Sequence, residues 1–119
     1  MSNKSLRKNL ETIWKKIIKL RAGMKSELSG QIGILHAHHI VKKPCDFLRF
    51  DLDNGICLTA GEHNYGIHGK YEEDYREKIK AIRGSDIYEK LNMRRHNTCD
   101  LRLVEIYLKE ELKKYKNDL

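Results

Sequence analysis

The sequence predicts an α+β fold that is mostly helical, with one ββα unit in the middle of the chain. Apolar residues recur at spacings of three and four near both ends, which is typical of amphipathic helices. Residues 34–41 and 56–59 are short and begin and end with β-branched residues, which is typical of strands. The chain has 119 residues, and we expect a single domain: a basic helix in 1–25, the ββα unit in 34–69 and further helices in 71–119.

The first helix is predicted over residues 4–22, where one apolar stripe is surrounded by basic residues. The stripe consists of Leu6, Leu10, Ile13, Ile17 and Leu20. Residues 1–25 contain eight Lys or Arg and one Glu, which accounts for the whole net charge of +7. A polyanionic partner such as nucleic acid explains this asymmetry, and a solubilising helix face is the alternative. On the first interpretation the helix contacts nucleic acid through Lys8, Lys15 and Lys19.

The ββα unit is predicted as a hairpin followed by a helix. The first strand, residues 34–41, ends at Lys42-Lys43-Pro44. A loop over 44–55 closes with the turn signal Asp53-Asn54-Gly55, and the second strand, 56–59, is expected to run antiparallel to the first. A helix is expected to start near Gly61-Glu62. Lys42 and Lys43, at the end of the first strand, are candidate nucleic-acid contacts.

The rest of the chain is predicted to be helical. Tyr71, Tyr75, Ile79 and Ile82 fall at helical spacing, and a short helix through Ile87 and Leu91 follows. The last helix is expected to begin at Asp100, a good N-cap residue. Its inward-facing residues are predicted to be Leu101, Val104, Leu108, Leu112 and Tyr115. Arg94 and Arg95, in the polar stretch before it, are further candidate nucleic-acid contacts.

Histidines are concentrated around the predicted hairpin. Five of the six histidines fall between residues 36 and 68. Strand alternation points His38 and His39 in different directions, so one could bind a metal ion while the other takes a proton from water. A lone histidine is usually structural, but a vicinal pair with two later histidines favours a site. His36 is interpreted as a strand neighbour of that site or as a group that hydrogen-bonds one of its ligands.

The segment AHHIVKKPCDFLRFDLDNGICLTAGEHNYGIHG resembles the signature of the HNH (ββα-metal) endonucleases, most closely the small phage-type members. The tail KLNMRRHNTCDLRLVEIYLKEEL is similar to the C-terminal helices of phage HNH proteins. The resemblance implies that His39 is the general base and that Asn54 braces the loop to the strand. It implies metal ligands at His38, His63 and His68, with Asn64 as the substitute for His68 if the register shifts.

One departure from that family concerns a structural zinc site. Many HNH proteins carry two CxxC pairs that hold zinc, whereas here the corresponding places are Ser26 and Ser29, and Thr59 and Glu62. We therefore expect a fold that does not depend on zinc. The three cysteines, Cys45, Cys57 and Cys99, are interpreted as reduced cytosolic thiols.

The resemblance predicts a metal-dependent DNA endonuclease of phage or prophage origin, acting in the cytoplasm of a bacterial host. It would use one divalent cation (Mg²⁺, Mn²⁺, Ni²⁺ or Zn²⁺) and contact DNA mainly through the backbone. The alternative is a non-catalytic DNA-binding accessory protein for phage packaging or recombination, with a vestigial metal site. No apolar run approaches the roughly 20 residues that span a bilayer, so no membrane partner is expected.

Overall fold

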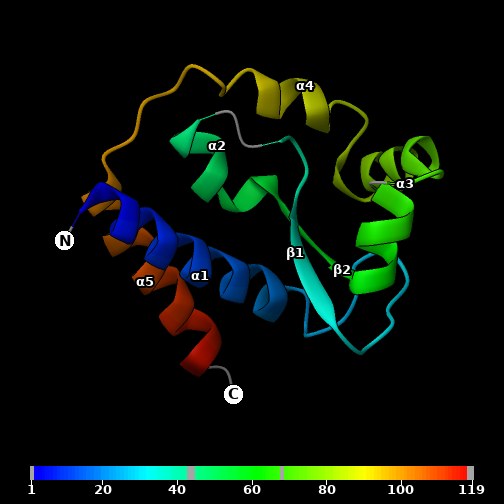
Figure 1. Ribbon diagram of the computed structural model, residues 1–119, viewed down its shortest axis with the longest axis horizontal. Coiled ribbons are helices and arrows are strands. Elements are labelled where there is room, and N and C mark those ends of the chain that lie inside the picture. Colours follow the sequence, from blue (N-terminus) through cyan, green and yellow to red (C-terminus); the bar gives the residue numbers. More distant parts are fainter. Residues whose placement is uncertain (1, 43–44, 68, 118–119) are drawn as a thin grey trace.

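The computed structural model describes residues 2–42, 45–67 and 69–117, and it has the predicted α+β architecture (Figure 1). The strands are β1 (Leu35–His39) and β2 (Gly55–Thr59). The helices are α1 (Asn3–Arg21), α2 (Asp46–Phe50), α3 (Glu72–Arg83), α4 (Ile87–Asn92) and α5 (Leu101–Asn117). In the described part of the chain, no helix combines the length and the apolar character that crossing a bilayer requires.

The predicted hairpin is present, and its register is defined along its whole length. Strands β1 and β2 pair antiparallel, with Leu35 opposite Thr59 and His39 opposite Gly55. The connection between them differs from the expected loop, because it contains the single turn of α2 and a 3₁₀ turn at Leu52–Asn54. Helix α2 buries Leu48 and Phe50, but five residues are too few to show a helical period in the sequence.

The segment after β2 is helical, as expected, but irregular. Glu62–Ile67 has π-helical geometry, which is rare and often found at functional sites. It begins with a capping box: the Thr59 N–H donates to Glu62 Oε1 (2.8 Å), and the Glu62 N–H donates to Thr59 Oγ1 (3.1 Å). This box fixes the direction in which the segment leaves β2.

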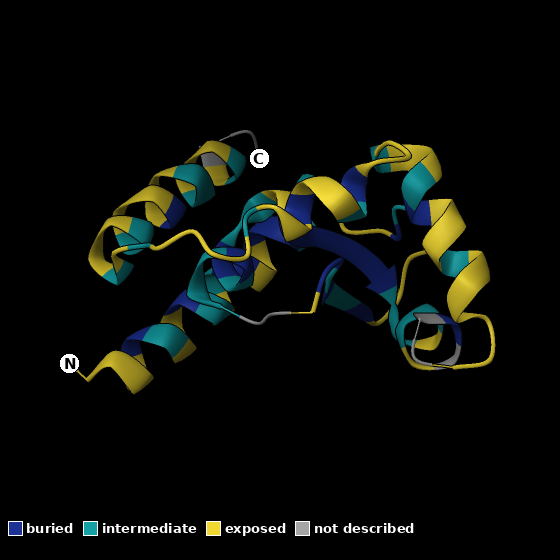
Figure 2. Cartoon of the chain, turned by 90° about the horizontal axis from the view of Figure 1, so that it is seen from above, coloured by how far each residue is buried: buried dark blue, intermediate teal, exposed yellow. Residues whose placement is uncertain are grey.

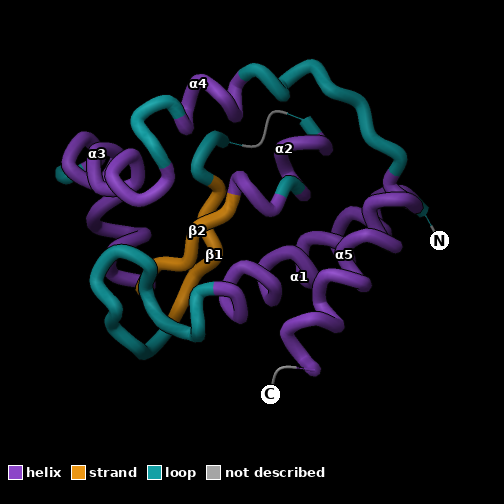
Figure 3. The backbone as a smooth tube through the Cα atoms, turned by 180° about the vertical axis from the view of Figure 1, so that it is seen from behind, coloured by secondary structure: helices purple, strands orange, loops and turns teal. Residues whose placement is uncertain are grey.

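The hairpin is packed between two groups of helices (Figures 1 and 3). Helix α1 packs against one of its faces and α5 lies beside α1, while α3 and α4 contribute Ile79, Ile87 and Leu91 to a second cluster. Strand β2 serves both clusters, since Cys57 joins the first and its neighbours Ile56 and Leu58 join the second. Figure 2 shows the buried residues along the hairpin and on the inner helix faces.

Helix α1 buries a stripe that is rotated slightly from the predicted one. The buried residues are Leu6, Leu10, Trp14, Ile17 and Ile18, whereas Ile13 and Leu20 are only partly buried. The centre of the stripe is Trp14, whose large ring reaches the hairpin. In α5 the predicted inward residues do pack on this cluster, with Leu108 fully buried, and Asp100 Oδ1 accepts from the Arg102 N–H at the start of the helix.

Helix α1 approaches the hairpin most closely at Gly55. A Cβ atom built at this residue would overlap the side chains of Ile18 and Trp14, so these two side chains occupy the space that any larger residue would need. The Arg21 guanidinium donates to the carbonyls of Leu52 and Gly55, both at 2.9 Å. The end of α1 and the start of β2 are therefore held together by packing and by hydrogen bonds.

Candidate active site

Three histidine rings lie together where β1 meets the π-helical segment. His36 and His38 alternate along β1 and so share a face, and His63 comes from Glu62–Ile67. The His38 and His63 ring centroids are 4.9 Å apart, and the Nδ1 atoms of His36 and His63 are 2.8 Å apart. Metal-binding histidines usually engage their second ring nitrogen in a hydrogen bond, and His36 gives His63 such a partner. His63 would then meet a metal ion through Nε2.

The expected ligand set is only partly assembled by the described residues. His38 and His63 are adjacent, and their imidazoles suit a transition metal such as Zn²⁺ or Ni²⁺. His68 lies outside the described residues, and Asn64 is exposed. Within residues 2–42, 45–67 and 69–117, no group of three or more His, Cys, Asp or Glu side chains is placed to hold a metal ion.

His39 points away from this group and is held on two sides. Its ring stacks on Trp14 of α1, with centroids 4.1 Å apart and planes 6° from parallel. Its Nε2 lies 2.9 Å from the Arg49 carbonyl oxygen. A carbonyl oxygen can only accept, so Nε2 carries the proton, and in the neutral ring Nδ1 is the basic nitrogen. A general base requires this tautomer to be fixed.

The support of His39 extends into α1 and α2. The Trp14 Nε1–H donates to the Asp51 carbonyl (3.0 Å), which fixes the ring that His39 stacks on. The Arg49 guanidinium donates to Glu11 Oε2 (2.7 Å), which ties the segment carrying the Arg49 carbonyl to α1. Neither Trp14 nor Arg49 was predicted as a site residue from the sequence. The one signal in the sequence was Trp14 itself, a large aromatic residue within the predicted helix 4–22.

Asn54 is fully buried between the connection and the end of β1. Its Oδ1 accepts from the Val41 N–H (2.7 Å), and its Nδ2 donates to the carbonyls of Val41 (3.0 Å) and Leu48 (2.9 Å). All of these partners are backbone groups. Asn54 therefore sets where the chain goes directly after His38 and His39, and it does not face the histidine rings.

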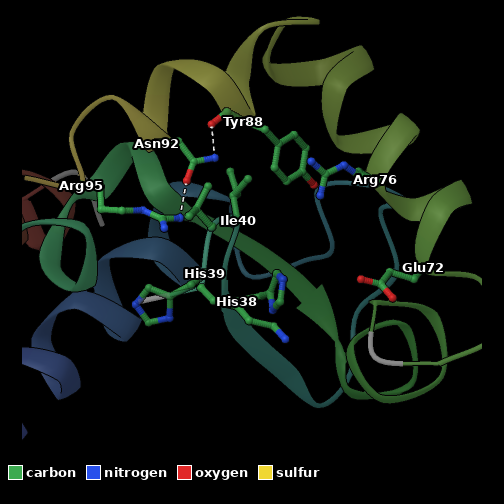
Figure 4. A pocket seen from close by; sticks show the side chains of 10 residues that line it. His38, His39, Ile40, Glu72, Arg76, Tyr88, Asn92 and Arg95 are labelled. Atoms are coloured by element: carbon green, nitrogen blue, oxygen red, sulfur yellow. Dashed lines mark hydrogen bonds between the residues drawn. The ribbon is translucent and has the colours of Figure 1, made fainter. Parts of the chain in front are cut away.

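A cavity of about 470 Å³ lies between α1 and β1. The expected base, His39, and two of the three expected ligands, His38 and His63, line it, together with two of the lysines expected to contact nucleic acid. The lining residues are Glu11, Lys15, Ala37, His38, His39, Lys42 and His63. A second cavity, of about 220 Å³, lies toward α3 and α4 and shares His38, His39 and Lys42 with the first (Figure 4).

The remaining candidate nucleic-acid contacts are dispersed. Lys8 is exposed on α1, and Lys19 is partly buried near its end, while Lys43 lies outside the described residues. Arg95 lines the second cavity. Arg94 instead donates to Asp51 (2.7 Å) and Asp53 (3.0 Å), and these hydrogen bonds raise its pKa. Its guanidinium is thus engaged in holding α4 to the hairpin connection.

The four positions that the resemblance matches to the cysteine pairs, Ser26, Ser29, Thr59 and Glu62, do come together, as a hydrogen-bonded cluster. Ser26 Oγ accepts from the backbone N–H groups of Leu28 and Ser29, both at 3.1 Å. Burial alone would raise the pKa of Glu62, but hydrogen bonds from Thr59 and from the Ser26 and Ser29 hydroxyls outweigh it and lower that pKa. Hydroxyl and carboxylate groups therefore join the 26–29 turn to the end of β2.

Comparisons with known proteins assign neither a family nor a function to the chain. No protein-family model matches the chain, and neither a curated protein nor a solved structure does. The functional interpretation depends on the arrangement of the histidines and of the charges around them.

Proposed function

We propose that the chain is a metal-dependent DNA endonuclease in which His39 is the general base, a function that its sequence resemblance to HNH nucleases also favours. One observation supports the proposal most: His38, His39 and His63 line the same cavity, and His39 Nε2 is hydrogen-bonded to the Arg49 carbonyl. This arrangement separates a basic nitrogen from a pair of candidate metal ligands, which is the division of tasks that phosphodiester hydrolysis needs.

In the proposed reaction, His39 Nδ1 takes a proton from a water molecule as the water oxygen forms a bond to phosphorus. The bond from phosphorus to the 3′ oxygen breaks, and that oxygen leaves with the electron pair and is protonated from solvent. Lys15 and Lys42, on the walls of the cavity, attract and orient the phosphate. His38 and His63 would hold a divalent cation, which when bound stabilises negative charge on the phosphate and the leaving oxygen.

The test is cleavage of supercoiled plasmid in EDTA and with Mg²⁺, Mn²⁺, Ni²⁺ or Zn²⁺. Wild type is expected to cut only with a cation, and His39→Ala is expected to be slower by about 10²–10⁴-fold because a positioned base is removed. His63→Ala is expected to weaken cation binding itself, measured by calorimetry. His96→Ala removes an exposed histidine outside the cavity and is the matched control. Equal rates for wild type and His39→Ala would contradict the proposed role.

A second candidate is a non-catalytic DNA-binding accessory protein, as in phage packaging or recombination. It is favoured by the incomplete ligand set among the described residues. It predicts that wild type shifts plasmid mobility in every buffer and cuts in none. Circular dichroism in EDTA is the control in either case, because an unchanged helical signal shows that loss of cleavage is not loss of fold.

A further inference from the structure

The smaller cavity continues the proposed active site toward α3 and α4. His38, His39 and Lys42 line both cavities, so the two adjoin at the end of β1. The far wall of the smaller cavity is formed by Glu72 and Arg76 of α3 and by Tyr88, Asn92 and Arg95 in and just after α4 (Figure 4). If one phosphate of a DNA strand lies at the histidines, the neighbouring nucleotide of that strand would lie in this smaller cavity.

Arg76 is held in this wall by an aromatic ring. Its guanidinium carbon lies 3.8 Å from the centroid of the Tyr88 ring, which is close stacking. The N–H groups of a guanidinium lie in its plane, so a guanidinium stacked on a ring presents its donors along the edge. Tyr88 is partly buried, and it restricts the freedom of an otherwise exposed side chain.

Arg95 is held by a short relay of hydrogen bonds. Its guanidinium donates to Asn92 Oδ1 (2.6 Å), and Asn92 Nδ2 donates to the Tyr88 carbonyl (2.8 Å). Figure 4 shows this relay running along α4 to the edge of the cavity. The same residue, Tyr88, therefore supports Arg76 with its ring and Arg95 through its carbonyl.

The way these two arginines are held differs from that of four other arginines. Arg7, Arg49, Arg83 and Arg94 each pair with a carboxylate. Arg76 and Arg95 are held by a ring and an amide, which orient a guanidinium without cancelling its charge. With Lys42 they place three positive charges on the cavity lining against one negative charge, that of Glu72. Glu73 and Glu77 lie near Tyr88 and weaken this field, but they do not line the cavity. The lining residues themselves are positive on balance and suit an anion.

We propose that the smaller cavity binds a second phosphate of the DNA strand, the one next to the phosphate being cleaved, through Arg76, Arg95 and Lys42. The proposal rests on the nuclease function proposed above. Oriented arginines bind phosphate oxygens by charge-assisted and often bidentate hydrogen bonds. Such a contact fixes the register of the strand without reading its bases.

The test compares two substrates for each variant. Bis(p-nitrophenyl) phosphate has one phosphodiester and no neighbouring phosphate, whereas a short DNA duplex has both. The quantity measured is kcat/KM for the duplex divided by kcat/KM for the small diester. Arg76→Gln and Arg95→Gln are each expected to lower this ratio by roughly tenfold, because each removes one charge-assisted hydrogen bond to the second phosphate. Arg102→Gln, an exposed arginine on α5, is the charge-matched control.

The outcomes separate the two proposals. If wild type cleaves both substrates and the double variant Arg76→Gln/Arg95→Gln keeps the wild-type ratio, the second phosphate site is wrong and the nuclease proposal stands. If wild type cleaves neither substrate with any cation, the nuclease proposal fails. In that case, the phosphate site is tested by measuring duplex binding in EDTA. The site is supported if the double variant binds the duplex more weakly than wild type, with a log–log salt slope flatter by about one. It is overturned if the double variant binds like wild type.

Discussion

At the scale of single residues, Asn54 is fully buried and forms buried hydrogen bonds to three backbone groups, two of Val41 and one of Leu48. Each buried polar group left without a partner costs about 1–3 kcal/mol, so Asn54→Ala is expected to lower the free energy of unfolding by roughly 3 kcal/mol or more. Asn54→Asp keeps the acceptor for Val41 but turns an oxygen toward two carbonyls, and is expected to be at least as destabilising at neutral pH. Urea unfolding followed by circular dichroism measures both.

Asn97→Ala is the control for this prediction, because Asn97 is exposed. It is expected to change the free energy of unfolding by less than about 0.5 kcal/mol. If Asn54→Ala were as mild as this control, the buried hydrogen bonds of Asn54 would not stabilise the connection between the strands.

The sequence allowed the adjacent histidines to be chosen as candidates, but not the residues that support them. His38 and His39 stand out by their spacing and by strand alternation. Trp14 and Arg49 act on His39 from positions 25 and ten residues away along the chain, through interactions that depend on how α1 and α2 dock. Interactions of this kind have no period or spacing in the sequence, so only the folded structure reveals them.

At the scale of secondary-structure elements, the Glu62 cluster joins the 26–29 turn to β2, and it carries a pH dependence. The pKa of Glu62 is lowered from its ordinary value of 4.5 in the folded chain. A carboxylate with a depressed folded-state pKa stabilises the fold above its unfolded-state pKa, and this stability disappears as the pH falls through the folded-state value. Glu62→Gln is therefore expected to be less stable at pH 7 and to lose less stability than wild type on acidification.

Urea unfolding over a pH series from about 7 to 3 checks this, because the difference between wild type and Glu62→Gln should shrink as the carboxylate is protonated. Glu77→Gln, at an exposed position on α3, removes the same charge and is the control. A difference between wild type and Glu62→Gln that stayed constant across the series would show that titration of this carboxylate does not contribute.

The elements themselves could be predicted where they were long enough to be periodic. The residues of α1, α3 and α5 show helical spacing over three turns or more, and both strands begin and end with β-branched residues in the predicted ranges 34–41 and 56–59. Helix α2 and the π-helical geometry of Glu62–Ile67 were missed because each is short, and because tertiary packing stabilises them. The capping box of Thr59 and Glu62 could be recognised in the sequence as the pattern T-x-x-E. These two residues were instead interpreted only as the positions at which many HNH proteins have a cysteine pair.

At the scale of the whole molecule, the charge of α1 is expected to determine nonspecific DNA affinity. Lys8, Lys15 and Lys19 are spaced to share one side of the helix, and Lys15 reaches the histidine cavity. Replacing all three with Gln is expected to weaken binding about equally for unrelated sequences. It should also flatten the salt dependence, by a log–log slope of roughly 0.9 for each phosphate that the lysines no longer neutralise. Fluorescence anisotropy with two unrelated duplexes at several salt concentrations measures this.

A charge-matched triple variant on α5 separates a local effect from a loss of net charge. Lys109, Lys113 and Lys116 are exposed, and replacing them with Gln changes the net charge by the same amount. If the α1 variant kept the wild-type affinity and salt slope, the α1 lysines would not contact the DNA. The same conclusion would follow if both triple variants lost affinity equally. The sequence located the excess charge in residues 1–25, but which lysine faces the histidines depends on the rotation of α1, which Trp14 sets.

Trp14 also gives the protein a single source of intrinsic tryptophan fluorescence. It is the only tryptophan in the chain, its ring fills the space beside Gly55, and it stacks on His39. Fluorescence excited at wavelengths that tyrosine does not absorb therefore comes from Trp14 alone. This residue lies where α1, the hairpin and the proposed base, His39, meet. A stopped-flow refolding trace of that emission would time the docking of α1 and the formation of the His39 environment together, without an attached dye.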